Sequence, residues 1–326
     1  MLAAALFSCA TPAFRTARGA SQAKGERIVT DEVGRRVKIP AEVHRIVTLA
    51  PNLTETVYAL GLGDRLVGDT NFCDTPPAAK QKPHVGSPQD PSIEAIAVLH
   101  PDLVLATTSI NRLDTAVALE RAGIPVYTTD PETVNGMLDS ITHMADAAGA
   151  SEQGVALVAQ LHARLDGLHA RLSERPMVHV LFVVWDQPLT TIGQNTFIAD
   201  ALRYAGAESI ILSDRKWPEV NIEEVVRLQP DYIVFTAEHS GAGVTDVAGL
   251  RARPVWKDLD AVESGHVANV SEEIVRPSPG LIDVIEQLAH ELHPEAFATG
   301  SETRRNSESE IRFAFEMKEK HTACAR

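Results

Sequence analysis

The sequence predicts an α/β protein of two Rossmann-like lobes, each with a parallel sheet, joined by one long interlobe helix. The first observation is an internal repeat, because residues 92–105 (SIEAIAVLHPDLVL) are echoed by residues 221–234 (NIEEVVRLQPDYIV). The second is that strand and helix patterns alternate along the chain, as in parallel sheets wrapped by helices. The third is a helical apolar pattern over residues 151–173, longer than an average helix and placed between the two alternating regions.

The first lobe is expected to begin with a short apolar strand and to continue in strict alternation. The expected order is a strand at 45–50, a helix at 52–61 capped by Asn52 or Thr54, a strand at 65–69, the first repeat copy, a helix at 112–122, a strand at 126–128 and a helix at 132–147. A loop with Pro76 and Pro77 separates the second strand from the repeat. This order is typical of one parallel sheet covered by helices.

The bridging helix and the second lobe follow. One face of the helix is expected to carry Val155, Leu157, Leu161, Leu165, Leu168 and Leu172. The second lobe is expected to contain a strand at 178–184, a helix at 197–205, the second repeat copy, a strand at 266–270 and a helix at 280–292. The resulting domain boundaries are a leader and linker at 1–24, the first lobe at 25–150, the bridge at 151–174, the second lobe at 175–297 and a polar tail at 298–326.

Each repeat copy predicts a polar helix cap, an amphipathic helix, a Leu-x-Pro-Asp turn and a short buried strand. Each also has a glutamate in the first turn of its helix, Glu94 in one copy and Glu223 in the other. A carboxylate there is stabilised by the unpaired amides and the positive end of the helix dipole, so helix capping alone explains it. The other interpretation is a matched pair of acidic contact points, one on each lobe.

Composition limits the class of protein. The 326 residues carry a formal net charge of -14, which argues against a nucleic-acid binder, because such proteins need a basic surface. Apolar runs long enough to cross a bilayer are missing from the sequence. We therefore expect a soluble or lipid-anchored protein, which needs a separate membrane partner for any transport.

The N-terminus resembles a clipped secretory leader. The segment LFSC at residues 6–9 resembles a lipoprotein processing site, which makes Cys9 a candidate for lipidation. The other two cysteines, Cys73 and Cys324, have no metal-binding spacing. Pairing of the two in an oxidising compartment is an alternative, but Cys324 lies in the polar tail, so we expect two free thiols.

Known catalytic motifs are missing from the sequence. It has no Gly-rich phosphate loop, no HExxH zinc helix, no CxxC pair and no nucleophile elbow, and its histidines are scattered singly. We therefore predict no catalytic residues and no metal ligands, although spatial triads need not be adjacent in sequence.

A combined signature is carried by residues 30–40 (TDEVGRRVKIP), residues 45–55 (RIVTLAPNLTE), both repeat copies, residues 188–193 (PLTTIG) with Thr196 and Phe197, and residues 276–279 (RPSP). Together these segments resemble the periplasmic solute-binding proteins of ABC importers for cobalamin, ferric siderophores and haem, the helical-backbone class. The resemblance covers residues 27–294 and is strongest to the cobalamin-binding members. It implies two α/β lobes joined by a rigid helix, with the ligand in the cleft between them.

The resemblance also gives the repeated glutamates a function. In this family one glutamate on each lobe pairs with arginines of the two transmembrane subunits, and Glu94 and Glu223 match in residue type and position. It implies a permease dimer as partner. Two separated charge pairs orient a two-lobed protein on a two-fold transporter while adding modest affinity each.

For the cleft, the resemblance implies five ligand-binding residues. Trp217, in KWPEV, matches a Trp-Pro sequence with which cobalamin binders contact the corrin, and Phe72 matches a cleft tyrosine. Trp185 ends a core strand and faces either the cleft or the core. Glu272 and Arg276 match an acid and an arginine that hydrogen-bond corrin amides, although Arg276 is also suited to a carboxylate of haem or of an anionic siderophore. Ordinary packing is the alternative for each aromatic residue.

This chain also departs from the cobalamin binders. Pro88 and Thr107 stand where those proteins have further tryptophans, so we expect a less aromatic cleft. A smaller or more polar ligand is therefore an alternative to cobalamin. Haem needs an axial tyrosine or histidine, and core packing accounts for the four tyrosines, so haem ranks below corrinoids and siderophores. The sequence thus predicts a monomeric, non-enzymatic receptor, periplasmic or lipid-anchored, with a corrinoid as transported ligand and no prosthetic group. A chelatase-like enzyme and a ligand-free scaffold are the alternatives from other classes.

Overall fold

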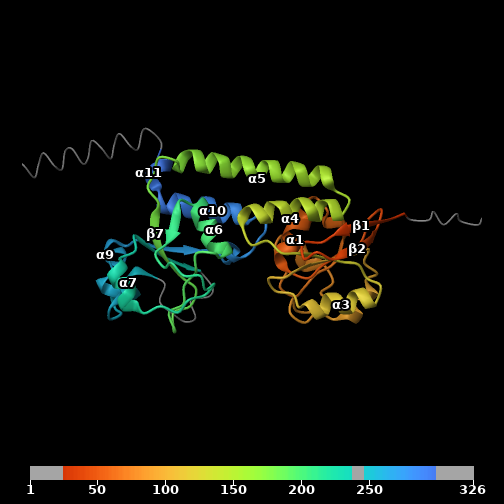
Figure 1. Cartoon of the computed structure of the whole chain (residues 1–326), viewed down its shortest axis with the longest axis horizontal. Helices are drawn as coiled ribbons and strands as arrows, with labels where there is room; N and C mark the ends of the chain where they lie inside the picture. Colours follow the sequence, from red (N-terminus) through yellow and green to blue (C-terminus); the bar gives the residue numbers. More distant parts are fainter. Residues whose placement is uncertain (1–24, 237–245, 299–326) are drawn as a thin grey trace, which may run out of the picture.

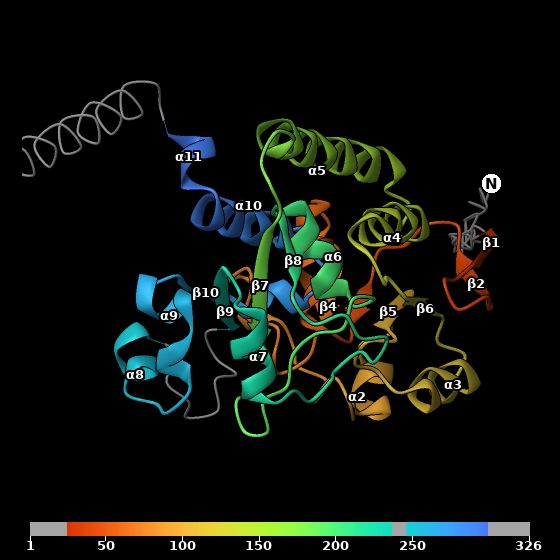
Figure 2. The same cartoon turned by 60° about the vertical axis from the view of Figure 1, so that its left-hand side comes forward.

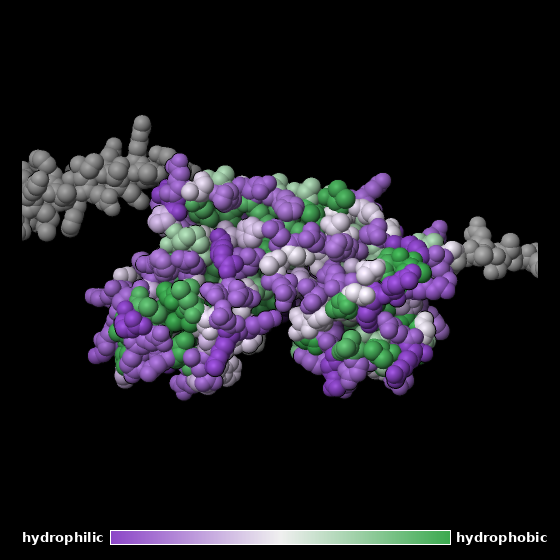
Figure 3. All heavy atoms as spheres, viewed as in Figure 1, coloured by the Kyte–Doolittle hydropathy of each residue, from purple (hydrophilic) through white to green (hydrophobic). Residues whose placement is uncertain are grey.

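The computed structural model describes residues 25–236 and 246–298, and these form two α/β lobes below a long helix (Figure 1). The leader with Cys9, and the tail after Ala298 with Cys324, lie outside the described residues, so the expectations for them stay predictions. The predicted fold class is confirmed. Figure 3 shows the lobes as separate masses with a notch between them, on the side away from the long helix.

The first lobe has a four-stranded parallel sheet in the order β4-β3-β5-β6. Its strands are β3 (Ile46–Thr48), β4 (Leu66–Gly68), β5 (Leu103–Thr107) and β6 (Val126–Thr129). Its helices are α1 (Pro51–Ala59), α2 (Ile93–Val98), α3 (Leu113–Arg121) and α4 (Val134–Ala147), with short 3₁₀ turns η1 (Gly63–Arg65) and η2 (Ala79–Gln81).

The second lobe repeats this sheet. Its strands β7 (Val178–Val183), β8 (Ala207–Ser209), β9 (Tyr232–Thr236) and β10 (Val267–Val270) are parallel in the order β8-β7-β9-β10. Its helices are α6 (Phe197–Tyr204), α7 (Ile222–Leu228), α8 (Val247–Arg251), α9 (Asp260–Ser264), α10 (Leu281–Leu292) and α11 (Pro294–Phe297), with 3₁₀ turns η3 (Trp256–Asp258) and η4 (Glu272–Val275). Counted from the first strand of each lobe, both sheets have the order 2-1-3-4, so the repeat in sequence is a repeat in topology.

The repeat extends to details of hydrogen bonding. Asp102 Oδ2 accepts from the backbone amides of His44 and Arg45 at 2.9 and 3.0 Å, where β3 begins. Asp231 Oδ2 accepts from the amide of His179 in β7 at 2.8 Å. The Leu-x-Pro-Asp turn therefore ties each repeat helix to the first strand of its own lobe.

The helix α5 (Ser151–Leu172) bridges the lobes, as predicted, and is about 33 Å long at 1.5 Å per residue. The leucines Leu161, Leu165, Leu168 and Leu172 are buried against the lobes. Val155 was predicted to share this face, and that prediction is wrong, because its side chain is 62% exposed. Gly154 is buried in its place, and a Cβ on Gly154 would lie only 2.4 Å from the Cβ of Ala145 in α4.

One hydrophobic core runs through both lobes and α5. In β7, Val180 and Phe182 face this shared core, whereas Leu181 and Val183 face a smaller outer core of the second lobe. The first lobe has an equivalent outer core that contains Val47 and Ile96. A shared inner core joins the lobes by more than a flexible linker.

Two features of the first lobe differ from the sequence prediction, and the short strand β8 of the second lobe was not predicted either. A hairpin of β1 (Glu26–Thr30) and β2 (Arg36–Pro40) precedes the first sheet, where no strands were expected. Helix α1 has Ala50 as its N-cap, without a side-chain cap, so the prediction of Asn52 or Thr54 as the cap is wrong. Asn52 and Thr54 instead lie within α1, and their side chains are buried.

Candidate functional site

A cavity of about 450 Å³ lies between the lobes. Loops that follow the carboxyl ends of β3, β4 and β5 form one wall, and the segment after β10 forms the other. The first wall consists of Pro51, Asn52, Phe72, Pro88, Gln89, Ser109 and Ile110, and the second of Glu272, Val275, Arg276 and Pro277. Open parallel sheets bind ligands beyond the carboxyl ends of their strands, so this location is the one their topology favours.

Three of the five predicted ligand-binding residues line this cavity. Phe72 belongs to the first lobe and is 61% exposed, which leaves its ring available to a ligand. Glu272 and Arg276 face it from η4 and the loop after η4. The structure thus brings an aromatic ring together with an acid and an arginine from the opposite lobe.

Trp185 and Trp217 do not line this cavity, but they lie on two connected loops of the second lobe. Thr190 forms isolated β-bridges with both Trp185 and Glu219, so the two loops are hydrogen-bonded to each other. The indoles are 44% and 51% exposed. An exposed ion pair of 3.7 Å between Lys216 and Glu132 of the first lobe shows that the Trp217 loop lies beside the boundary between the lobes.

The loop of Trp185 is fixed from behind. Asp186 accepts two hydrogen bonds of 2.9 Å from Arg253, whose guanidinium stacks 4.8 Å from the ring centre of the buried Trp256. The Nε1 of Trp185 donates to the carbonyl of Gln187 at 2.9 Å. These contacts hold the Trp185 indole at the surface of the lobe rather than in its core.

Arg276 is the centre of the charge network in the cleft. Its guanidinium lies 3.7 Å from Oε1 of Glu55 in α1 and 3.8 Å from Oε2 of Glu272. Burial raises the pKa of the Glu55 carboxyl, while Arg276 acts in the opposite direction. Asn52 Nδ2 adds a second contact between the lobes by donating to the carbonyl of Pro277 at 3.4 Å.

Sequence reasoning missed Glu55 as part of the site. Its side chain points from α1 into the boundary between the lobes, and its partner Arg276 is in the other lobe. A buried glutamate in the stretch PNLTETVYA is the only local signal, and it does not reveal the partner. Pro88 lines the cavity, whereas Thr107 is buried at the end of β5.

Glu94 and Glu223 occupy matching positions, each the second residue of its helix. Both side chains are exposed, and within the described ranges neither forms an ion pair. The caps predicted beside them are confirmed, since Ser92 accepts from the amide of Ala95 and Asn221 from that of Glu223. Figure 2 places α2 and α7 at the ends of the lobes away from α5.

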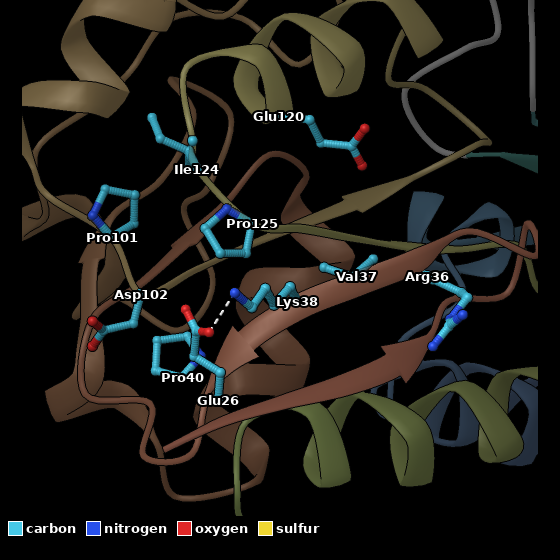
Figure 4. A pocket seen from close by; sticks show the side chains of 11 residues that line it. Glu26, Arg36, Val37, Lys38, Pro40, Pro101, Asp102, Glu120, Ile124 and Pro125 are labelled. Atoms are coloured by element: carbon cyan, nitrogen blue, oxygen red, sulfur yellow. Dashed lines mark ion pairs between the residues drawn. The ribbon is translucent and has the colours of Figure 1, made fainter. Parts of the chain in front are cut away.

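A second, larger cavity of about 530 Å³ lies away from the cleft, beside the β1–β2 hairpin (Figure 4). Only first-lobe residues line it, most of them charged residues or prolines, and an ion pair between Glu26 and Lys38 crosses its edge. Because it has no aromatic wall and no contribution from the second lobe, we place the ligand site in the interlobe cavity.

Two further observations concern the described residues only. Residues 25–236 and 246–298 contain no cluster of three or more His, Cys, Asp or Glu side chains placed to hold a metal ion. No helix in the same ranges has the length and apolarity needed to cross a membrane.

Cys73 is a buried free thiol, as predicted, and its Sγ accepts from Thr54 Oγ1 at 3.1 Å.

Two similar lobes, a helical bridge and a cleft lined from both sides define a two-lobed ligand-binding protein. The periplasmic binding protein family model matches residues 46–273, and the chain belongs to this family. Its members work with ABC transporter permeases, so the chain is the substrate-binding component of an ABC importer of the vitamin B12, haem and siderophore group. The family places it in the periplasm or on the extracytoplasmic face of the membrane.

Similar proteins of known sequence include a vitamin B12-binding protein and a lipoprotein. The vitamin B12-binding protein of Vibrio cholerae serotype O1 is 29% identical over 251 residues, which cover 76% of this chain and 89% of that protein. The uncharacterized ABC transporter substrate-binding lipoprotein YvrC of Bacillus subtilis is 31% identical over 307 residues, covering 91% of this chain and 96% of that protein.

Solved structures show the same architecture. The periplasmic vitamin B12-binding protein BtuF of Vibrio cholerae superposes with a TM-score of 0.66 at 27% identity, covering 79% of this chain and 99% of BtuF. The periplasmic haem-binding protein BhuT, solved with two haems, gives a TM-score of 0.69 at 26% identity, covering 78% of this chain and 99% of BhuT.

Proposed function

We propose that the protein captures a corrinoid in the interlobe cleft and delivers it to a permease dimer, without performing chemistry itself. The observation that carries the proposal is the cavity in which Phe72 faces Glu272 and Arg276 across the lobe boundary. An aromatic wall opposite a few polar groups suits a large flat ligand with amide side chains at its edge. Similarity to vitamin B12-binding proteins supports this ligand class.

In this proposal the side chains have separate roles. Phe72 packs against one face of the macrocycle, and Trp217 and Trp185 extend the apolar contact along the second lobe. Glu272 and Arg276 hydrogen-bond amide groups at the edge of the ligand. The receptor acts as a monomer, because one chain supplies both walls.

A ferric siderophore or haem is the alternative occupant. Similarity to BhuT supports haem. The four tyrosines support the corrinoid instead: Tyr127 is buried, Tyr58, Tyr204 and Tyr232 pack against the shared core, and the described lining of the cleft is formed by other residues. Haem ligation by a tyrosine would therefore require a rearrangement of core packing.

The experiment is a calorimetric titration of the purified full chain with aquocobalamin, cobinamide, haemin and ferric siderophores. We expect saturable one-to-one binding of a corrinoid, weakened about tenfold or more by Phe72→Ala or Trp217→Ala, because each removes a large apolar contact. Val155→Ala is the matched control, since Val155 is equally exposed but lies on α5.

The titration also separates the alternatives. Binding of haemin or a siderophore alone would keep the receptor class and replace the ligand. A chain that binds none of these compounds would point to the scaffold or the chelatase-like enzyme.

We further propose that Glu94 and Glu223 dock the receptor on the permease. Their matched positions, exposure and lack of ion pairs within the described ranges support this role. The double reversal Glu94→Arg with Glu223→Arg is expected to abolish uptake in cells that carry the importer, while ligand affinity stays within about twofold.

A matched control reverses two exposed glutamates at the two ends of α5. The pair Glu152→Arg with Glu174→Arg changes the net charge equally, but on the side of the molecule away from α2 and α7. We expect uptake to survive this control. Uptake that survives the reversal of Glu94 and Glu223 would refute the docking role.

A further inference from the structure

Among the described residues that line the cleft, Arg276 is the only cation. Two carboxylates already accompany it, Glu55 at 3.7 Å and Glu272 at 3.8 Å. The carboxylate of Glu55 is contributed by the first lobe and is 8% exposed, so it approaches the arginine from beneath the cavity rather than from solvent. Arg276 therefore belongs to a charge network before any ligand arrives.

Two further acidic residues, Glu273 and Asp74, lie near Glu55. Oε2 of Glu273 and Oε2 of Glu55 each lie 3.9 Å from the place that a Cβ on Gly280 would take, so the two carboxylates are close neighbours. The charges of Glu273 and Asp74 both act to raise the pKa of Glu55. Two carboxylates thus lie within 4 Å of the guanidinium, and two more, Glu273 and Asp74, act on Glu55.

We infer that this set of carboxylates makes the cleft select metal chelates whose edge is neutral or cationic and reject polyanionic ones, with Glu55 and Glu272 as specificity-determining residues. The inference rests on the proposed function, because it assigns the ligand to this cleft, and it narrows the ligand class. Corrinoids whose side chains are amides are accepted, whereas corrinoids or porphyrins with free carboxylates are excluded.

The physical reason is the cost of an unpaired charge. A carboxylate entering this cleft loses water and can pair with Arg276 only in competition with Glu272 and Glu55, two carboxylates that are already in place. A ligand with amide groups at its edge leaves the ion pairs of Arg276 intact and adds hydrogen bonds to the same side chains. The alternative, Arg276 as a free clamp for a ligand carboxylate, would require its partners to be displaced.

Two pairs of ligands with matched frameworks and different charge test the inference. Cobinamide and cobyrinic acid share the corrin ring, but the first carries amides where the second carries carboxylates. Ferrioxamine B and ferric enterobactin are both ferric chelates, one cationic and one polyanionic. Calorimetry on the full chain is expected to give at least about tenfold tighter binding of the neutral or cationic member in whichever pair binds.

Variants assign the effect to the carboxylates. Glu55→Gln and Glu272→Gln are each expected to reduce the affinity ratio between the two ligands of a pair by about tenfold. The reduction should come from tighter binding of the anionic ligand and not of the neutral one. Glu152→Gln on α5 removes the same charge far from the cleft and is expected to leave the affinity ratio unchanged. Added salt should reduce this affinity ratio more in the wild type than in the variants.

The outcomes separate this inference from the proposed function. Tight binding of ferrioxamine B without cobinamide would refute the corrinoid and support the charge selection. Equal affinity for cobinamide and cobyrinic acid would support the corrinoid and overturn the charge selection. Tight binding of haemin or of ferric enterobactin, or an affinity ratio that Glu55→Gln and Glu272→Gln leave unchanged, would also overturn it.

Discussion

The contact between α4 and α5 at Gly154 supports a quantitative prediction about how the bridging helix is held. A Cβ on Gly154 would lie 2.4 Å from the Cβ of Ala145, and neither atom can rotate away. The second glycine of the same helix, Gly167, has nothing within 4 Å of the equivalent position. The two glycines therefore form a matched pair in which only one is required by packing.

The substitutions Gly154→Ala and Gly167→Ala gain the same helix propensity, about 1 kcal/mol each, because both residues lie inside α5. Gly167→Ala should show this gain as increased stability. Gly154→Ala also forces α4 and α5 apart, which costs about 1 to 3 kcal/mol for an overpacked contact. The predicted difference between the two variants is this overpacking cost, with Gly154→Ala the less stable.

Urea unfolding of the wild type and both variants, followed by circular dichroism, measures the difference in unfolding free energy. The double variant Ala145→Gly with Gly154→Ala restores the space and should show a favourable coupling between the two sites. Equal stability of Gly154→Ala and Gly167→Ala would refute the close packing of α5 on α4.

Three further predictions concern buried or capping groups. The pKa of Glu55 in the folded protein is raised above 4.5 by burial, so folding favours its protonated form. The stabilisation present below pH 4.5 is lost as the pH rises through the folded pKa, so Glu55→Gln should gain stability relative to the wild type as the pH rises above 4.5. Unfolding titrations measure this gain, and a pH-independent difference would contradict it. Asp102→Ala and Asp231→Ala should each destabilise the fold by about 0.5 to 1.5 kcal/mol, because Asp102 accepts from two backbone amides, and Asp231 accepts from one and contacts Nδ1 of His179 at 3.3 Å. An unchanged free energy of unfolding in urea would contradict the assignment. Burial raises the pKa of the Cys73 thiol, so iodoacetamide should leave Cys73 unlabelled in the native protein and label it in urea. Peptide mass spectrometry measures the labelling. Rapid labelling of the native protein would place the thiol at the surface.

The fold could be predicted from the sequence because its signals are local and repeated. The two copies of the Ser/Asn-Ile-Glu helix and the Leu-x-Pro-Asp turn indicate equivalent units, and the structure gives both sheets the same strand order. The length of α5 follows from its apolar periodicity. Its exact buried face does not, since the exposure of Val155 depends on the close approach that Gly154 allows.

Other elements could not be predicted, because they depend on distant contacts. Strand β8 has three residues, and its pairing with β7 defines it more than its own composition. The hairpin of β1 and β2 differs, because in β2 the buried Val37 and Ile39 alternate with the exposed Arg36 and Lys38, a pattern that sequence reasoning missed.

The candidate site was predictable in part. Phe72, Glu272 and Arg276 were assigned by resemblance and do line one cavity. Glu55 was missed, since its role arises only when α1 of the first lobe meets the segment after η4. A contact between residues so far apart in sequence leaves no periodic pattern.

The central claim is that a corrinoid binds between the lobes, with Phe72 on one side and Arg276 on the other. A crystal structure of the full chain grown with cobinamide tests it most directly. We expect density for a corrin ring in the interlobe cavity, with its amides beside Glu272 and Arg276. A corrinoid bound elsewhere, such as in the charged cavity beside the β1–β2 hairpin, would show that the interlobe cavity is not the ligand site.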